Sequence, residues 1–348
     1  MKLLAAKPDF VIGEKGIDSV EEVMLGGVTQ SILIQAENPD NPVLLFLHGG
    51  PSTPIPGIAC RGKDYTIATN TKELVKHFVL VFWDQRGTGK SYNPKLSEDS
   101  FTIRQFVSDA NELTDLLRNR FNKEKIFLAG HSWGSVIGLH LASEQPEKFH
   151  SYVGVSQIIS WTETDRFALQ WAKEQARKRG NKKALKELES VGEPPFLDSY
   201  EQWGVLRKWL VRFNSMIYSD DQIKHPGMLK STKELFQSKD YTLKDVYNTF
   251  VKGFQLVYNK KMVLVRDLST FNFKESIKKL NLPVTFLHGD KDVHVSKLIV
   301  LDFYEKVDSA YPKNLYLLPK SSHFFHPDDS KLIEGYLIDQ LKYQAVFS

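Results

Sequence analysis

A serine flanked by two glycines is the feature of this sequence best suited to chemistry. Ser132 lies at the centre of Gly130-His131-Ser132-Trp133-Gly134, directly after an apolar run. This pattern predicts a strand, a sharp turn and a helix, because small residues two positions before and after the serine leave room for the strained turn. The hydroxyl would then be exposed at the tip of the turn. The backbone N–H of Trp133, at the start of the helix, would point to where negative charge develops when a carbonyl is attacked. We therefore predict that Ser132 is a nucleophile, although Gly-x-Ser-x-Gly also arises by chance.

A serine hydroxyl is a weak nucleophile at neutral pH and needs a general base that is itself oriented by a carboxylate. In an open α/β sheet such partners lie in loops that directly follow strands. Asp290 and Asp292 follow one apolar run, and His323 and His326 follow the next. The residues alone leave both pairs open. Either choice gives the chain order Ser, Asp, His, which is that of α/β-hydrolases rather than of the other two common serine protease folds.

Apolar runs and their spacing predict the elements that position these residues. Residues 20–36 predict a β-hairpin that turns at Gly26-Gly27. Strands are expected at residues 43–47, 78–83, 126–129, 152–155, 283–288 and 315–318, and helices at 102–120, 297–307 and 328–343. Thr102 and Gln105 have the spacing of a capping box. The alternation of strand and helix predicts an α/β fold, with a mostly parallel sheet and helices on both faces.

The alternation breaks between residues 159 and 270, where apolar residues repeat at intervals of three and four. This predicts an all-helical cap over 159–270, inserted into a core domain formed by 1–158 and 271–348. The charged stretch 173–189 is expected to be a solvated helical surface. Tryptophans of this cap either form its own core, the commoner use of a helical aromatic stripe, or line an apolar substrate chamber. They are Trp161, Trp171, Trp203 and Trp209.

The composition limits the class of protein. With 41% hydrophobic and 25% charged residues in 348, it is typical of soluble globular proteins. The net charge of +4 is spread along the chain, which argues against nucleic-acid binding. Cys60, the single cysteine, fits a reducing compartment, so a cytoplasmic location is expected. The apolar start of Met1–Asp9 is too short for a signal peptide, no run is long enough to span a membrane, and no cofactor or metal-binding spacing is present.

Three motifs together resemble the proline iminopeptidase branch of the α/β-hydrolases. They are His48-Gly49-Gly50-Pro51, Trp83-Asp84-Gln85-Arg86-Gly87-Thr88-Gly89-Lys90-Ser91 and the glycine-flanked serine motif. The resemblance covers residues 20–158 and 280–330. Three motifs in the correct order make coincidence improbable.

The resemblance implies a role for several residues. The oxyanion hole would be formed by the backbone N–H groups of Gly50 and Trp133. The acid would be Asp292, at the end of the Gly-x-x-Asp loop, and the base would be His323, which together with Ser132 complete a catalytic triad.

This chain also departs from the family pattern. Ser52 stands where a glycine usually follows His-Gly-Gly-Pro, and Ser322 stands where a glycine usually precedes the catalytic histidine. Asp84 and Arg86 match residues that hold loops in place in this family. Proline iminopeptidases bind the free amine of the substrate with cap carboxylates, which the motifs do not identify here. The candidates are Glu163, Glu174, Glu201 and Glu234.

The favoured function is therefore that of a serine hydrolase acting through an acyl-enzyme, as an aminopeptidase that releases N-terminal residues such as proline from short peptides. A carboxylesterase or lactonase acting on a neutral ester could use the same triad. A small-molecule receptor that has lost turnover is a third possibility, but a binding protein has no need of all three triad residues.

Overall fold

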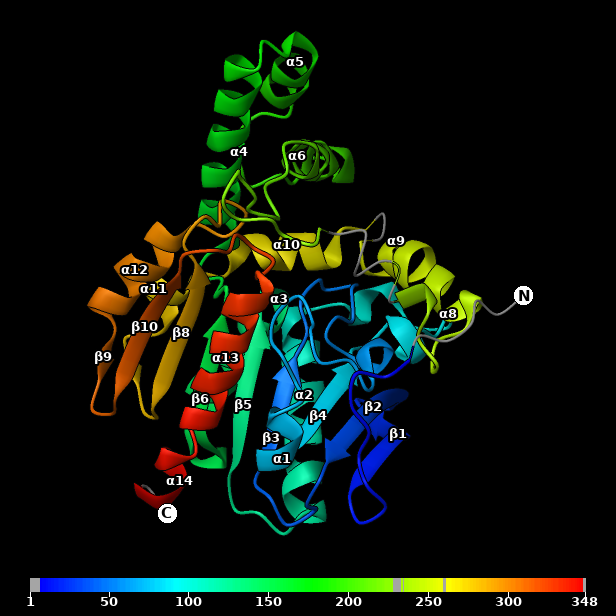
Figure 1. The fold of residues 1–348 in the computed structure, drawn as a ribbon. Helices are drawn as coiled ribbons and strands as arrows, with labels where there is room; N and C mark the ends of the chain where they lie inside the picture. Colours follow the sequence, from blue (N-terminus) through cyan, green and yellow to red (C-terminus); the bar gives the residue numbers. More distant parts are fainter. Residues whose placement is uncertain (1–6, 228–232, 234, 259–260, 347–348) are drawn as a thin grey trace.

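The computed structural model describes residues 7–227, 233, 235–258 and 261–346. Its centre is an eight-stranded sheet in the order β1-β2-β4-β3-β5-β6-β8-β10 (Figure 1). β2 pairs antiparallel with β1 and β4, and the other neighbours are parallel. The strands are β1 (Ile17–Leu25), β2 (Val28–Ala36), β3 (Val43–Leu47), β4 (Val79–Asp84), β5 (Ile126–His131), β6 (Phe149–Val155), β8 (Val284–Gly289) and β10 (Lys313–Leu318). The predicted α/β class, antiparallel start and mostly parallel sheet are confirmed.

Helices and short elements connect these strands. Within the predicted core they are α1 (Leu74–His77), α2 (Ile103–Arg120), α3 (Trp133–Glu144), α11 (Phe273–Ser276), α12 (Lys297–Lys306), α13 (Pro327–Asp339) and α14 (Lys342–Val346). Single turns are η1 (Ile58–Cys60), η2 (Gly89–Ser91), η3 (Glu98–Ser100) and η4 (Pro146–Lys148), and β7 (Lys279–Leu280) pairs with β9 (Asp308–Ser309). The last predicted helix, 328–343, is two helices in the structure: α13 ends at Asp339 and α14 begins at Lys342.

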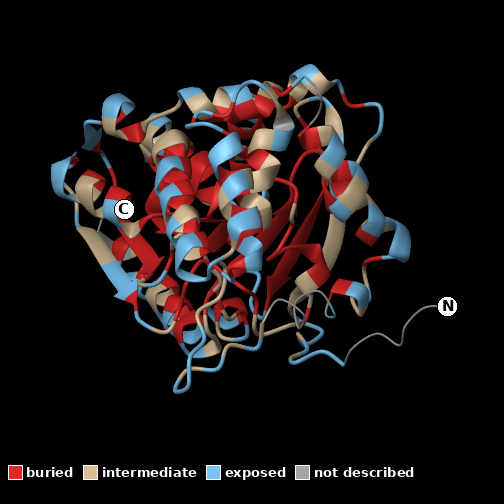
Figure 2. Ribbon diagram, turned by 90° about the horizontal axis from the view of Figure 1, so that it is seen from above, coloured by how far each residue is buried: buried red, intermediate tan, exposed pale blue. Residues whose placement is uncertain are grey.

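The sheet separates two apolar cores, as Figure 2 shows by the buried residues between the helices and the strands. Alternate residues of each strand point to opposite faces: Val43 and Leu45 belong to the core that includes α2, α3 and α12, and Leu44 and Phe46 belong to the core that includes α1 and α13. All five residues of β3 are buried. Strands covered on both faces lose the alternation of apolar and polar residues, which is why the sequence shows continuous apolar runs there.

One predicted helix cap is only half formed. The Thr102 hydroxyl accepts a hydrogen bond from the Gln105 backbone N–H at 3.1 Å, as expected. The Gln105 side chain does not return to Thr102 but donates to Asp109 at 2.7 Å. The carboxylate is a stronger acceptor, so the predicted capping box is wrong in its second half.

Helices follow β6 and extend from one end of the sheet, at the top of Figure 1. They are α4 (Trp161–Lys178), α5 (Lys182–Ser190), α6 (Tyr200–Arg212), α8 (Leu243–Tyr247), η5 (Asn248–Gly253), α9 (Phe254–Val257) and α10 (Val263–Thr270). An isolated β-bridge joins Ser160 to Asn272 where the chain leaves and re-enters the sheet region. Residues 1–6 of the apolar N-terminal stretch, and Glu234, lie outside the described residues.

The apolar repeats in this helical segment have mixed outcomes. Leu206 and Leu210 are buried on α6, whereas Phe250, in the repeat of Val246, Phe254 and Val257, is 43% exposed. The reason is η5, a π-helical turn, which takes more residues per turn than an α-helix and therefore rotates Phe250 off the apolar face.

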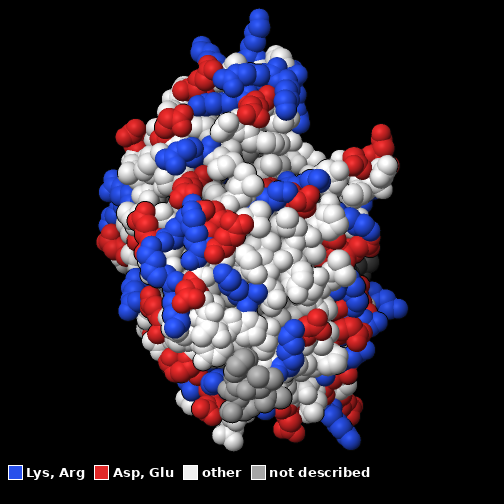
Figure 3. Space-filling model, turned by 90° about the vertical axis from the view of Figure 1, so that its left-hand side faces the viewer, with Lys and Arg blue, Asp and Glu red and all other residues white. Residues whose placement is uncertain are grey.

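The charged stretch 173–189 lies on α4 and α5, at the tip of the molecule. Basic and acidic side chains are intermixed over the face seen in Figure 3. Ala184 and Leu188 are buried on the inner side of α5, so the helix is amphipathic rather than solvated all round. Among the described residues, no helix has the length and apolar character needed to cross a bilayer.

Candidate active site

Ser132 occupies a strained turn between β5 and α3. Its backbone has φ 52° and ψ −117°, a conformation that residues with a side chain rarely adopt. The two flanking glycines are required by close approach: a Cβ on Gly130 would lie 2.4 Å from the Gly134 carbonyl oxygen, and a Cβ on Gly134 would lie 2.2 Å from the Leu47 carbonyl oxygen. The turn therefore forms only because both glycines lack side chains.

A matched pair of glycine substitutions tests this packing. We expect Gly134→Ala to destabilise the protein by about 1–3 kcal/mol or more, because the obstructing atoms belong to the backbone of β3 and cannot move aside. Gly335→Ala is the control, since Gly335 is also helical but exposed, and a Cβ added there would have no atom within 4 Å. It should raise stability by roughly 0.5–1 kcal/mol. Chemical denaturation measures both, and equal effects would contradict the close-packed turn.

The structure brings Ser132, His323 and Asp292 together from three different loops. His323 Nε2 lies 3.0 Å from Ser132 Oγ. His323 Nδ1 lies 2.9 Å from Asp292 Oδ2. All three residues are buried, with exposed fractions of 7%, 3% and 4% for Ser132, His323 and Asp292. This is the arrangement in which a carboxylate orients an imidazole that can take the serine proton.

The second oxygen of Asp292 fixes the carboxylate. Oδ1 accepts hydrogen bonds from the backbone N–H groups of His294 and Val295, both at 2.8 Å. Burial alone would raise the pKa of Asp292, but the charge of His323 and its hydrogen bond outweigh burial and lower that pKa to about 2. Asp292 is therefore ionised throughout the neutral range.

Asp290 and His326, the alternatives to Asp292 and His323, make other contacts. Asp290 forms ion pairs with Lys297 and with Lys291, the latter at 3.0 Å. His326 caps α13, where its Nδ1 accepts a hydrogen bond from the Asp328 backbone N–H at 3.2 Å. Neither is therefore available to complete the arrangement around Ser132.

The two other buried histidines of the motifs are held neutral. Burial lowers the pKa of His131 to about 3 and that of His48 to about 4. His48 Nδ1 donates to the Gly49 carbonyl at 2.5 Å, and its Nε2 accepts from the Gln85 backbone N–H at 3.2 Å. His48 thus ties the predicted oxyanion loop to the loop after β4.

The Asp84 and Arg86 side chains support loops, as the resemblance implied. Arg86 donates to both oxygens of Asp109, at 2.8 and 2.9 Å, in a fully buried ion pair. Asp84 accepts from the Tyr241 hydroxyl and from the Lys90 backbone N–H. Burial raises the pKa of Asp84 to about 6, although both hydrogen bonds oppose this shift. The Tyr241 contact links the loop after β4 to the helical segment.

Of the two departures from the family pattern, Ser322 makes a side-chain contact that a glycine could not supply, whereas the contact of Ser52 is through its backbone. The Ser322 hydroxyl reaches the Ser215 carbonyl at 2.6 Å, and the backbone N–H of Phe324 donates to the Met216 carbonyl at 2.8 Å. The histidine loop is therefore fastened to the segment after α6. Ser52 is buried, and its carbonyl accepts from the Thr88 hydroxyl at 3.0 Å.

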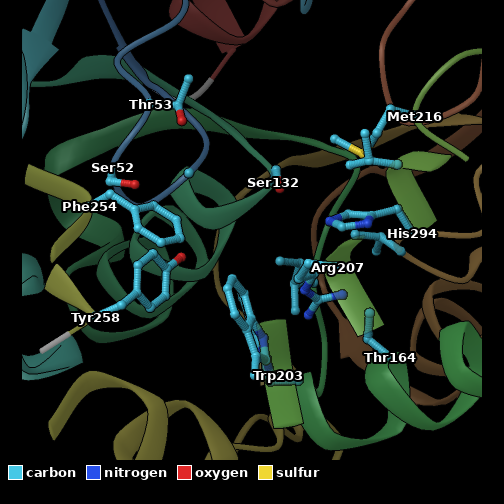
Figure 4. Close-up of a pocket in the computed structure, with 15 residues that line it drawn as sticks. Ser52, Thr53, Ser132, Thr164, Trp203, Arg207, Met216, Phe254, Tyr258 and His294 are labelled. Atoms are coloured by element: carbon cyan, nitrogen blue, oxygen red, sulfur yellow. The ribbon is translucent and has the colours of Figure 1, made fainter. Parts of the chain in front are cut away.

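A pocket of 270 Å³ opens beside Ser132 (Figure 4). The predicted oxyanion residue Gly50 lines it, and Trp133 begins α3 next to Ser132 with its indole N–H on Gln85 at 2.8 Å. Most of the wall is apolar, including Ile158, Trp161, Trp203, Met216, Phe254 and Tyr258. The volume is at the small end for ligand pockets, which favours a small substrate.

The tryptophans serve both uses considered from the sequence. Trp161 and Trp203 line the pocket and are also buried in the apolar core. Trp171 and Trp209 pack against Phe213, with ring centroids 6.5 and 5.4 Å apart, and Trp171 is only partly buried and also lines a second cavity.

The candidate amine-binding glutamates are not in this wall. Of the described residues that line the pocket, none is an aspartate or glutamate. Glu163 pairs with Lys274 at 2.6 Å, Glu174 contacts Gln170 at 3.5 Å, and Glu201 is exposed. Glu234 lies outside the described residues.

Sequence reasoning missed several polar residues of the pocket. Thr53, Thr164 on α4, Arg207 on α6 and His294 after β8 all line it. Thr53 and His294 lie next to predicted site motifs, whereas Thr164 and Arg207 gave no signal in the sequence. Within the described part of the chain, no group of three His, Cys, Asp or Glu side chains could hold a metal ion.

Comparison with known proteins identifies the family to which this fold belongs. A family model described as the alpha/beta hydrolase fold matches residues 42–330. The chain is 29% identical over 324 residues to "Probable aminopeptidase YbaC" of Bacillus subtilis, covering 93% of this chain and 96% of that one. It is 24% identical to a proline iminopeptidase of Saccharolobus solfataricus over 270 residues, 74% of each chain. The crystal structure of proline iminopeptidase from Mycobacterium smegmatis superposes with a TM-score of 0.63 at 15% identity, covering 95% of this chain and 100% of that one. The resemblance predicted from the motifs is confirmed.

Proposed function

We propose, since this chain belongs to the α/β-hydrolase family, that it is a serine hydrolase working through an acyl-enzyme on Ser132. The observation that carries the proposal is the pair of hydrogen bonds from Ser132 Oγ through His323 to Asp292, at 3.0 and 2.9 Å, at the edge of a pocket. The intact set also argues against a receptor that has lost turnover.

The mechanism follows from these contacts. Ser132 Oγ attacks the substrate carbonyl while its proton passes to His323 Nε2, and Asp292 stabilises the imidazolium. The backbone N–H groups of Gly50 and Trp133 stabilise the oxyanion. His323 then gives its proton to the departing amine or alcohol, which leaves the acyl group on Ser132. Water attacks this ester with His323 again as the base, and the acid product and the free serine result.

For the substrate we favour an N-terminal residue of a short peptide, as in an aminopeptidase of proline iminopeptidase type. The names and coverage of the relatives support this choice. We propose that residues 159–270 act as a cap over the core of 1–158 and 271–348, so that short chains enter and folded proteins do not. The single cysteine supports a reducing compartment such as the cytoplasm.

A specific observation favours a second candidate, a carboxylesterase or lactonase. No carboxylate is present among the described lining residues to pair with a substrate ammonium, and a guanidinium is present instead. An ester substrate needs no ammonium anchor and has the better leaving group.

Two assays separate these candidates. A fluorophosphonate probe should label the protein at Ser132, and absence of labelling would contradict the serine hydrolase proposal. If the protein is an aminopeptidase, proline p-nitroanilide is cleaved about 10- to 100-fold faster than its N-acetyl form, since a charge-assisted contact to the ammonium contributes roughly 1.5–3 kcal/mol. An esterase would instead hydrolyse p-nitrophenyl butyrate well and both anilides poorly. Equal rates on the free and acetylated anilides would exclude the aminopeptidase and leave the triad untouched.

A further inference from the structure

One wall of the pocket carries buried polar atoms that have no partner. Arg207 Nη1, Thr164 Oγ1 and His294 Nδ1 are each buried without a hydrogen-bond partner among the described residues. All three residues line the pocket, and Figure 4 shows Arg207 between His294 and Thr164. Buried polar groups are nearly always satisfied, so three unpaired groups in the wall of one pocket indicate a place where a ligand can complete their hydrogen bonds.

The guanidinium is held in a fixed position. Nη2 of Arg207 donates to Asp165, and its Cζ lies 4.8 Å from the ring centre of Trp203 and 5.5 Å from that of Trp161. Its side chain is 14% exposed. These contacts involve Nη2 and the plane of the guanidinium, and they leave Nη1 without a partner in a side chain that lines the pocket. A purely structural ion pair would not require the free Nη1 or the unpaired Thr164 hydroxyl beside it.

The donors define the ligand chemistry. An arginine N–H can only donate, and a threonine hydroxyl can donate as well. Burial, with the charges of His323 and Arg207, lowers the pKa of His294 well below its usual range, so His294 is neutral and adds no second cation. A guanidinium with an unpaired N–H next to a hydroxyl donor fits a carboxylate.

We propose that Arg207, with Thr164, binds a carboxylate of the substrate, so that this hydrolase acts on small acidic compounds. The proposal rests on the proposed serine hydrolase function and names its substrate class. The carboxylate lies either on the acyl part, as in a monoester of a dicarboxylic acid, or on the leaving group, as in a dipeptide with a free C-terminus. The second arrangement is compatible with aminopeptidase activity.

Matched substrate pairs test the proposal and distinguish the two arrangements. The acyl arm compares the mono-p-nitrophenyl ester of adipic acid with that of adipamic acid. The leaving-group arm compares Pro-Ala with Pro-Ala amide. We expect kcat/KM to favour the carboxylate over the carboxamide by about 10- to 100-fold in one arm. A ratio near one in both arms would overturn the proposal.

Substitutions test whether Arg207 and Thr164 cause the preference for a carboxylate over a carboxamide. Arg207→Gln removes the cation, and the double variant Asp165→Asn with Arg207→Gln avoids leaving a buried unpaired carboxylate. Both should bring the ratio close to one, and Thr164→Val should lower it several-fold. Arg212→Gln is the control, because Arg212 lies exposed on the same helix with its cation over Trp209. Comparing ratios cancels the intrinsic reactivity of each ester. If the double variant keeps the same ratio of kcat/KM between the acid and the amide substrate, other residues cause the preference and the role of Arg207 is refuted.

A binding measurement keeps this test independent of turnover. Titration calorimetry on the Ser132→Ala protein should show the acid of the preferred pair binding at least about 10-fold more tightly than its amide, and the double variant should remove this difference. If fluorophosphonate labels the unchanged protein but acid and amide bind equally, the serine hydrolase stands and the carboxylate site is wrong. If the acid binds more tightly than the amide but fluorophosphonate does not label the unchanged protein, the carboxylate site stands and the serine hydrolase proposal is wrong.

Discussion

Replacing Ser132 by alanine should lower kcat/KM on any cleaved substrate by on the order of 10⁴-fold or more, because the acyl-enzyme route depends on its oxygen. The fold should persist: the described contact of the Ser132 Oγ is the 3.0 Å hydrogen bond to His323, and a methyl group fits the same space. Progress curves at high enzyme concentration measure the loss, and thermal melting confirms that the variant is folded.

Ser143→Ala is the matched control for this variant. Ser143 lies on the same helix, α3, and its hydroxyl donates to the His140 carbonyl at 2.9 Å, away from the pocket lining. Its activity should stay within about two-fold of the unchanged protein, as for most substitutions away from functional contacts. If Ser132→Ala kept more than a tenth of the activity, another group would have to be the nucleophile.

Much of the fold could be predicted because its signals are local. The buried strands β3 and β4 appear as unbroken apolar runs, and the turn at Ser132 needs small residues that are visible in the sequence. It is harder to predict from the sequence which residues of a helix face the core. Phe250 fits the repeat of three and four, but the π-helical turn around it is set by packing against the rest of the molecule, which a repeat does not encode.

For the candidate site, the sequence predicted the loops but not every residue. Its loops could be located from the strands before them, but the residues alone did not distinguish Asp290 from Asp292. That choice depended on the resemblance, and the structure shows its physical basis: backbone amides hold Asp292, and lysines hold Asp290. Arg207 could not be singled out because it is one of several basic residues on α6. Only the packing of α6 against α4, which turns Arg207 between two tryptophans, separates it from solvated neighbours.

Asp292→Asn should also have a very large effect, for a reason specific to this loop. The backbone N–H groups of His294 and Val295 both donate to Oδ1, so the amide oxygen of an asparagine must take that position. Its NH₂ group then faces His323 Nδ1, which must become the acceptor, and the ring proton moves to Nε2. An imidazole with a proton on Nε2 cannot take the proton of Ser132.

We therefore expect Asp292→Asn to reduce kcat by roughly 10³- to 10⁴-fold, similar to the loss seen when the acid of other triads is replaced. Asp290→Asn is the matched control, since it makes the same change two residues away, where Asp290 pairs with Lys291 and Lys297 at the surface. Such partly exposed pairs contribute little, so we expect activity within about three-fold. Fluorophosphonate labelling rates should follow the same order, because labelling also needs an activated Ser132. A larger loss at Asp290 than at Asp292 would reverse the assignment of the acid, and equal small losses would mean that His323 does not depend on a carboxylate for its orientation.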